Sequence, residues 1–252
     1  MYVRVRLLGG MTIEGACGPV AGPAAQRHRL ALLAVLVASH PRGVPRDRLL
    51  ALLWPERDDS CARNLLNQAV YALRSVLGQD RIRSLSDELK IEPDRALECD
   101  LLQLRDALAN GRVERAVSRY GGPFLDGFFL PGSKAFEEWA AGERDGIERA
   151  YRAALEERAR ECRDASEAVG WWRRLALMAP DCARITLALM GVLEAAGDRG
   201  GALRLAQQHE ARLREEFDAE PNPEVVALAE RIRTHPRGPV ASGTWSASGD
   251  LH

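Results

Sequence analysis

Hydrophobic and polar residues follow the period of an α-helix between residues 60 and 77. In this segment, SCARNLLNQAVYALRSVL, apolar residues recur three and four positions apart and fill one half of a helical wheel. The other half is polar and consists of Ser60, Arg63, Asn64, Asn67, Gln68, Tyr71, Arg74 and Ser75. A helix divided in this way packs its apolar half on a core and presents its polar half to solvent or to a partner.

Strand patterns precede this segment and follow it. Residues 2–8, YVRVRLL, alternate apolar and polar side chains as a half-buried strand does, and the Gly9-Gly10 turn leads to a second strand near residues 11–14. Residues 15–23 predict a loop or a further short strand. Residues 81–91 predict a β-hairpin, which carries the cations Arg81, Arg83 and Lys90.

Two helix patterns lie between the early strands and the amphipathic segment. Residues 26–39 contain the apolar run LALLAVLVA and predict a core helix, and residues 46–53 predict a short helix that ends at Trp54-Pro55. In the acidic loop that follows, the last carboxylate, Asp59, is expected to cap the next helix.

The order of strands, three helices and a hairpin describes a winged helix. In this fold the second and third helices form a helix-turn-helix, and the third enters the major groove of DNA. The hairpin, or wing, then places its cations against the phosphate backbone or into the minor groove. The alternative for the hairpin is an ordinary sheet edge with solvated charges.

Beyond residue 100 the chain shows helix patterns only. Helices are predicted at residues 101–109, 112–120 and 135–163, and a stretch rich in Gly, Pro and aromatic residues, 121–133, precedes the last of them. A shift of 34 residues superposes Ala154-Leu155 on Ala188-Leu189, which is the period of a tetratricopeptide repeat.

The repeat predicts two stacked helix pairs, residues 148–181 and 182–220, followed by a final helix at residues 224–233. Trp171 and Trp172 lie in the first pair. At least one of them must belong to the core, and an exposed one is a candidate for stacking on a ligand.

These patterns together predict a mainly α protein with a small β part. We expect an N-terminal winged helix-turn-helix domain at residues 1–97 and an all-α, tetratricopeptide-like helical-repeat domain at residues 98–233. Residues 234–252 are rich in Pro, Gly, Ser and Thr, so we expect a disordered tail or linker there.

Charge distinguishes the two halves of this 252-residue chain. Residues 1–97 hold 14 Arg and Lys against 10 Asp and Glu, whereas the remainder holds 21 against 26, and no acid occurs between Asp59 and Asp80. Asn and Gln bond to adenine edges, Arg bonds to guanine or phosphate, and Tyr reaches phosphate, whereas carboxylates are repelled by the DNA backbone. The composition favours a helix that lies in a major groove; the alternative is a solvated face that happens to lack acids.

Signals for other chemistries are absent from the sequence. The five cysteines are widely spaced, which indicates buried thiols in a reducing cytoplasm. The histidines lack metal-ligand spacing, and there is no phosphate-binding, dinucleotide-binding or nucleophile motif. We therefore expect a bacterial cytoplasmic protein, associated with the nucleoid when bound to DNA, that is not an enzyme and that uses no metal, cofactor, small-molecule substrate or membrane.

Two segments resemble a known family. Residues 52–78, LLWPERDDSCARNLLNQAVYALRSVLG, together with the opening YVRVRLLGG, resemble the DNA-binding domain of the Streptomyces antibiotic regulatory protein family. Residues 119–151, RYGGPFLDGFFLPGSKAFEEWAAGERDGIERAY, resemble the start of the bacterial transcriptional activator domain that follows it in that family. The resemblance covers about residues 2–233.

The resemblance implies a transcription activator that binds direct repeats in promoter DNA and recruits RNA polymerase. Direct repeats would place two copies side by side, as a homodimer on double-stranded DNA that need not persist in solution. Base-edge contacts would fall to Arg63, Asn64, Asn67 and Tyr71. Backbone or flank contacts would fall to Ser60, Gln68, Arg74, Arg81, Arg83 and Lys90, and the polymerase-facing loop would hold Trp54, Glu56 and Asp58.

A second class of function fits the helical half of the chain. Stacked helix pairs form surfaces that commonly bind proteins or peptides. In this interpretation the protein is an interaction scaffold that uses the winged helix as a docking surface. Sequence-specific retention on DNA distinguishes the two classes.

Overall fold

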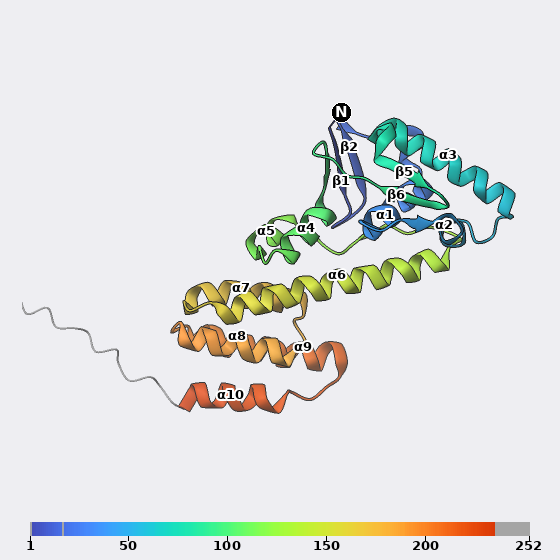
Figure 1. Ribbon diagram of the computed structural model, residues 1–252. Coiled ribbons are helices and arrows are strands. Elements are labelled where there is room, and N and C mark those ends of the chain that lie inside the picture. Colours follow the sequence, from blue (N-terminus) through green and yellow to red (C-terminus); the bar gives the residue numbers. More distant parts are fainter. Residues whose placement is uncertain (1, 17, 235–252) are drawn as a thin grey trace, which may run out of the picture. The chain divides into compact units, whose positions relative to one another are not determined.

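The chain forms two compact units in the computed structural model, which describes residues 2–16 and 18–234 (Figure 1). The units are Met1–Ala154 and Leu155–His252, and helix α6 (Lys134–Glu161) begins in the first and ends in the second. Most of the predicted tail, residues 235–252, lies outside the described residues. Thr234, predicted to begin that tail, instead ends helix α10 (Pro223–Thr234).

The first unit contains a four-stranded sheet with the order β3-β2-β1-β7. Its strands are β1 (Val3–Arg6), β2 (Thr12–Gly15), β3 (Gly18–Pro19) and β7 (Leu97–Cys99). β1 is antiparallel to β2, β2 is antiparallel to β3, and β1 is parallel to β7. The first two strands confirm the alternation pattern. Residues 15–23, for which a loop or a further short strand was predicted, contain β3 and the start of a short 3-10 helix (Gly22–Ala25). Strand β7 was not predicted, because three residues are too few to show an alternation.

Three helices follow the early strands, as predicted. They are α1 (Arg27–Ser39), α2 (Arg46–Leu53) and α3 (Asp59–Leu77). Every residue of α1 from Ala31 to Ala38 is buried, so α1 is the central core helix of this unit. α2 and α3 both pack against α1 and against each other.

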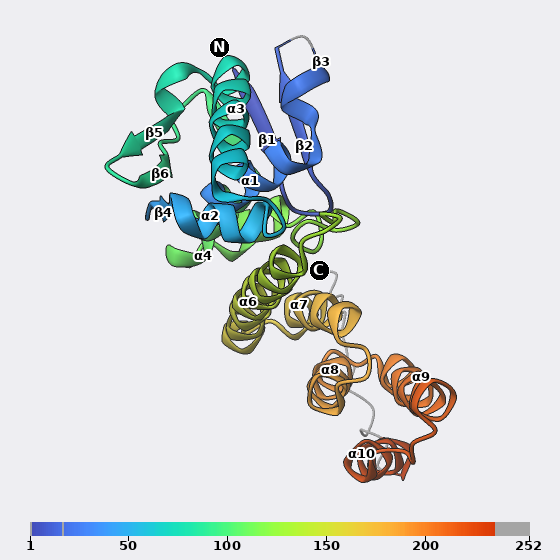
Figure 2. The same cartoon turned by 90° about the vertical axis from the view of Figure 1, so that its right-hand side faces the viewer.

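A second, three-stranded sheet has the order β4-β6-β5. β5 (Ile82–Leu85) and β6 (Glu88–Ile91) form the predicted hairpin, and β4 (Val44–Pro45) pairs with β6. One face of the hairpin is anchored by side chains with no exposed surface, those of Ile82, Leu89 and Ile91. In Figure 2 the hairpin lies on one side of α3 and strands β1–β3 lie on the other, which is the arrangement of a winged helix.

The stretch rich in Gly, Pro and aromatic residues packs against the first strand. The backbone N–H of Gly9 donates to the carbonyl of Pro123 at 2.9 Å. A Cβ atom on Gly9 would lie 2.6 Å from the carbonyl oxygen of Gly121, so this close approach requires glycine. Phe124 and Phe136 are buried beside Trp139.

These contacts explain why the first compact unit extends beyond α4 (Asp100–Ala109) and α5 (Val113–Arg119) to residue 154. The predicted boundary after residue 97 concerns a different question, namely whether residues 1–97 fold as an independent domain. That boundary stays a prediction.

The second unit is all helical. Besides the end of α6 and α10 it contains α7 (Ala165–Met178), α8 (Ala183–Ala195) and α9 (Arg199–Phe217). α7 packs on α8, and α8 packs on α9 and α10. These stacked helices are the helical-repeat part that the 34-residue period predicts, so the predicted fold class is confirmed for both parts of the chain.

The two tryptophans of α7 are both buried, with Trp171 8% exposed and Trp172 5% exposed. Both rings therefore belong to the core, as expected for at least one of them, and neither is an exposed candidate for stacking on a ligand. The guanidinium groups of Arg158 and Arg174 lie 5.5 and 5.3 Å from the centre of the Trp171 ring and help to cover it.

Across residues 2–16 and 18–234, the helices are too short or too polar to span a membrane.

Candidate nucleic-acid interface

Helix α3 begins at a defined cap. The carboxylate of Asp58 accepts a hydrogen bond from the backbone N–H of Cys61 at 2.9 Å and another from the hydroxyl of Ser60 at 2.7 Å. These bonds lower the pKa of Asp58. Asp59, which we expected to be the cap, is instead the first helical residue. The expectation was wrong by one position because two adjacent carboxylates are equally able to cap, and only the extended backbone of Asp58 decides between them.

We expect Asp58→Ala to lower the melting temperature and Asp59→Ala to leave it nearly unchanged. Because the pKa of Asp58 is lowered in the folded state, its stabilisation is present above the ordinary pKa of aspartate and is lost as the pH falls through the lowered value. Thermal unfolding followed by circular dichroism from neutral pH to about pH 3 measures this loss.

Asp58→Asn is the matched control for this prediction, because an amide caps a helix as well as a carboxylate does but does not titrate. The melting temperature of Asp58→Asn should equal that of the wild-type protein at neutral pH and should fall less as the pH is lowered. Equal melting temperatures for Asp58→Ala and Asp59→Ala would contradict the assignment of the cap.

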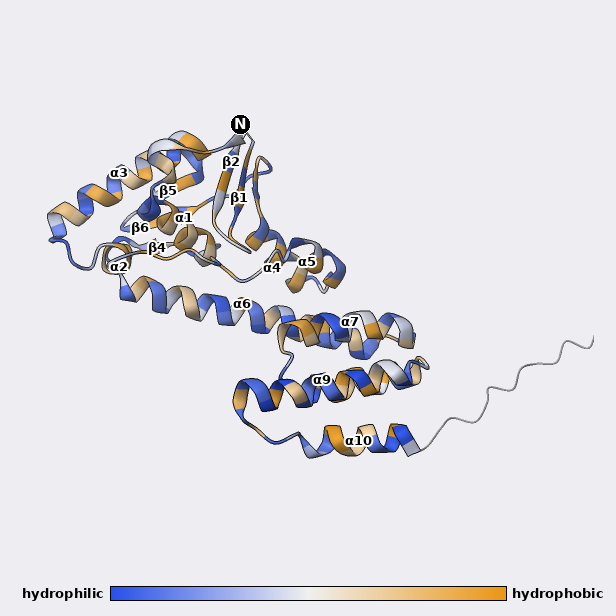
Figure 3. Cartoon of the chain, turned by 180° about the vertical axis from the view of Figure 1, so that it is seen from behind, coloured by the Kyte–Doolittle hydropathy of each residue, from blue (hydrophilic) through white to orange (hydrophobic). Residues whose placement is uncertain are grey.

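The two halves of α3 separate as the pattern predicts. The buried side consists of Ala62, Leu66, Ala69, Val70, Ala72, Leu73 and Leu77. On the other side Arg63, Asn64, Asn67 and Gln68 are exposed, and Tyr71 is 73% exposed. Hydrophilic and hydrophobic bands alternate along this helix in Figure 3. The fold therefore leaves the polar, acid-free side of α3 accessible to a partner.

The first two residues of α2 contact the polar side of α3. Arg46 donates from Nη1 to Oδ1 of Asn67 at 3.2 Å and from Nη2 to the hydroxyl of Ser84 on the wing at 3.1 Å. Asp47 forms an ion pair with Arg63 at 3.1 Å, and both side chains are more than half exposed. Arg46 and Asp47 were not among the residues predicted for the interface. The available signal was their position at the start of the second helix, which lies beside the third in a helix-turn-helix.

Two of the predicted backbone-contacting arginines bond inside the protein instead. Arg74 donates from Nε and Nη2 to the carbonyl of Ile82, at 2.9 and 2.6 Å, and so ties the end of α3 to the start of the wing. Arg81 is 7% exposed and pairs with Asp94 at 2.9 Å. We therefore assign both side chains to supporting the interface.

The remaining cations of the wing lie on its outer face. Arg83 is exposed and is directly opposite Lys90 in the hairpin register. Lys90 forms an ion pair with Glu92 at 2.9 Å, which lowers the pKa of Glu92. Ser60 and Gln68 are exposed on α3, at its start and its middle.

The loop between α2 and α3 is anchored by its tryptophan. Trp54 is 8% exposed and stacks on the ring of His28, with centroids 5.5 Å apart. Burial, together with the charge of Arg57, lowers the pKa of His28. Glu56 and Asp58 are exposed. The loop thus presents carboxylates, while Trp54 holds it in place.

A three-helix core with an outward polar third helix and an adjoining hairpin defines the winged-helix class of transcription regulators. The sequence profile described as "Bacterial transcriptional activator domain" matches residues 101–233. The protein therefore belongs to this family and is a regulator of the Streptomyces antibiotic regulatory protein type, as the resemblance suggested.

Structural comparison agrees with this assignment. The structure of Mycobacterium tuberculosis EmbR in complex with a low-affinity phosphopeptide is similar, with a TM-score of 0.62 and 26% sequence identity. The similarity covers 94% of this chain and 66% of the EmbR chain, so the present chain spans just under two thirds of the length of EmbR. A comparison with curated protein sequences gave no significant match.

Proposed function

We propose that this protein activates transcription by binding specific promoter DNA through α3 and the wing and by contacting RNA polymerase. The observation that carries the proposal is the exposed, acid-free side of α3. We assign its Arg63, Asn64, Asn67 and Tyr71 to base-edge contacts. These side chains supply the donors, acceptors and aromatic surface that major-groove recognition uses.

Asn67 has a defined orientation for this role. Its Oδ1 already accepts a hydrogen bond from Arg46, so the amide N–H groups remain for acceptors in the groove, such as purine N7. Arg46 thereby fixes a base-contacting side chain and also places its own charge between α3 and the wing.

Phosphate contacts are assigned to Arg46, Arg83 and Lys90, with Ser60 and Gln68 on the flanks of α3. Arg83 and Lys90 lie directly opposite each other, and like charges in this position destabilise a hairpin. Glu92 already pairs with Lys90, and a phosphate group would relieve the repulsion that remains. The wing tip carries Asp87 and Glu88, which disfavour insertion into a minor groove, so we place the contact on the sides of the wing.

The loop between α2 and α3 is assigned to RNA polymerase. Glu56 and Asp58 are exposed there, next to the base-contacting helix. Activators of this family would bind as two copies on direct repeats, each with its loop directed to polymerase. DNA supplies the spacing, so a stable dimer in solution is not required.

Asn67→Ala is expected to relax base preference at one position of the site by about 1–3 kcal/mol. Arg83→Ala should instead weaken all duplexes about equally and reduce the slope of log K against log salt by about 1. Sites selected from a random DNA pool, followed by fluorescence anisotropy titrations at several salt concentrations, measure both effects. Equal affinity for selected and random DNA would exclude the proposed function.

Unlike the two preceding substitutions, Asp47→Asn is expected to tighten DNA binding. In the free protein Arg63 forms an ion pair with Asp47. An exposed ion pair of this kind contributes about 0.2–1 kcal/mol. Its removal should therefore raise the affinity for DNA by roughly 1.5-fold to 5-fold. In an Arg63→Ala background the same Asp47→Asn substitution should give no gain. A gain of equal size in that background would show that the effect does not act through Arg63.

A further inference from the structure

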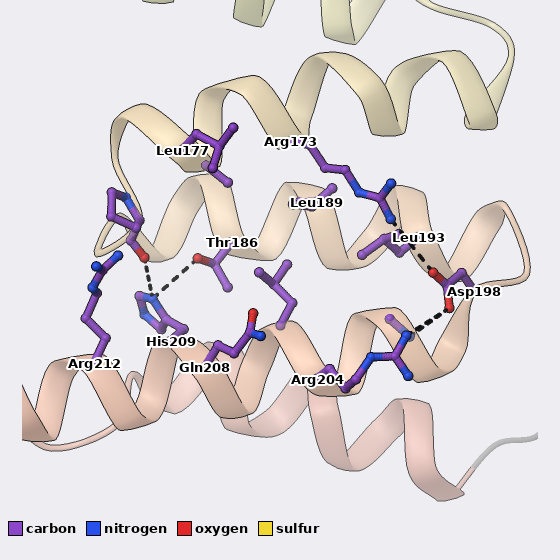
Figure 4. Close-up of a pocket in the computed structure, with 14 residues that line it drawn as sticks. Arg173, Leu177, Thr186, Leu189, Leu193, Asp198, Arg204, Gln208, His209 and Arg212 are labelled. Carbon is purple, nitrogen blue, oxygen red and sulfur yellow. Dashed lines mark hydrogen bonds and ion pairs between the residues drawn. The ribbon is translucent and has the colours of Figure 1, made fainter.

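A pocket of about 580 Å³ lies between α7, α8 and α9 in the second unit (Figure 4). Its lining residues fall between positions 173 and 212, so it is formed within that unit alone. The volume is in the range of small-molecule sites, which is about 300–1,000 Å³. DNA binding as proposed above makes no use of it.

Most of the lining is apolar. It includes Ala176, Leu177, Pro180, Leu189, Leu193 and Leu205. Leu189 and Leu193 are buried, whereas Leu177 is 83% exposed. This lining offers a continuous apolar surface to the body of a ligand.

One end of the pocket is positively charged. Arg173 from α7 and Arg204 from α9 lie 4.0 and 3.9 Å from the carboxylate of Asp198, which are ion-pair distances but too long for hydrogen bonds. Asp198 also caps α9 by accepting from the backbone N–H of Gly201 at 2.8 Å. Each guanidinium group carries five N–H donors, so both arginines retain donors for a further anion.

The lining contains a buried polar atom that lacks a partner within the described residues. His209 is 2% exposed, and its Nδ1 lies 3.3 Å from the carbonyl of Pro180 and 3.4 Å from the hydroxyl of Thr186. Because a carbonyl only accepts, Nδ1 donates to Pro180, and Nε2 is left buried without a hydrogen bond. Leaving such an atom unpaired costs free energy that a ligand can recover.

We propose that this pocket binds a small amphipathic anion. A carboxylate would accept hydrogen bonds from the N–H donors of Arg173 and Arg204 that do not face Asp198, and an aliphatic body would lie on the leucines. A hydroxyl group at the other end would bond to Nε2 of His209. Arg204 and His209 are five residues apart on α9, which is about 8 Å along the helix axis at 1.5 Å per residue. An acyl chain of medium length spans that distance.

Calorimetric titration of the full chain with four decyl compounds tests the head group. Decanoate is expected to bind, and decan-1-ol is expected to bind about 10-fold or more weakly, because the charge-assisted hydrogen bonds are lost. Decyltrimethylammonium should not bind, because its charge has the wrong sign. ω-Hydroxydecanoate should bind several-fold more tightly than decanoate, because its hydroxyl group pairs with His209.

Two charge reversals on α9 test the location. Arg204→Glu is expected to weaken decanoate binding about 10-fold or more, whereas the exposed Arg214→Glu, outside the pocket, should leave it unchanged. His209→Phe should abolish the advantage of ω-hydroxydecanoate over decanoate. Methyl chemical shifts of Leu189 and Leu193 in the wild-type protein should move on titration, and this readout requires no variant to fold.

Three results would overturn the proposal. They are equal binding of the decyl compounds irrespective of head group, equal effects of the two charge reversals, and saturable binding of a leucine-rich acidic peptide in the absence of decanoate binding. The last result would make the pocket a protein-docking groove. All of these measurements record ligand binding alone, so they are independent of whether DNA binding is confirmed.

Discussion

Leu73→Ala is expected to lower the free energy of unfolding by about 2–5 kcal/mol, because the substitution leaves a cavity under the third helix. Leu73 has no exposed surface and lies on the side of α3 that faces the core. Urea denaturation followed by circular dichroism measures the change. DNA binding should fall only in proportion to the unfolded fraction.

Tyr71→Ala is the matched comparison, two positions away on the opposite side of the same helix. Since Tyr71 is 73% exposed, the stability should change by less than about 0.5 kcal/mol. Its affinity for the selected DNA site should nevertheless fall, because a base-edge contact is removed. A loss of stability similar to that of Leu73→Ala would mean that the polar side of α3 is packed, and the interface would have to lie elsewhere.

Arg46→Glu is expected to weaken binding to the selected DNA site by about 100-fold or more. The substitution removes the hydrogen bonds to Asn67 and Ser84 and places a carboxylate between α3 and the wing, where repulsion by phosphates costs several kcal/mol. Fluorescence anisotropy at a fixed salt concentration measures the loss. Because both hydrogen bonds are exposed, the melting temperature should change little.

Arg115→Glu is the control for net charge. Arg115 is exposed on α5 in the same unit, so the variant changes the charge equally without altering α3 or the wing. Arg46→Lys keeps the charge but not the forked donors, so it should retain affinity for random DNA and lose part of its preference for the selected site. If Arg46→Glu and Arg115→Glu bind DNA alike, Arg46 does not belong to the interface.

The packing changes which arginines we assign to contacts with DNA. Two arginines predicted to contact the DNA backbone bond within the protein: Arg74 ties the end of α3 to the wing, and Arg81 pairs with Asp94 beyond the wing. Arg46, which was not predicted, lies on the surface between α3 and the wing. Both groups are arginines within one basic segment, so composition and periodicity do not separate a supporting role from a contacting one.

The sequence by itself determined the helices, the hairpin and the polar side of α3. Each of these depends on the spacing of apolar residues along a short segment, because a helix or a hairpin buries one face whatever its partner is. The 34-residue period likewise predicted the stacked helices of the second unit, since each pair must bury its apolar side on the next.

Only the tertiary structure decided which side chains are available. Strand β7 pairs with β1 across more than ninety positions, Arg46 and Asp47 contact residues of α3, and Arg158 of α6 covers Trp171 of α7. Such contacts join residues that are distant in the chain, and their free energies depend on distance and burial, which no local pattern contains. The sequence therefore determined which surfaces form, and the packing determined which polar groups on those surfaces bond inside the protein and which face a partner.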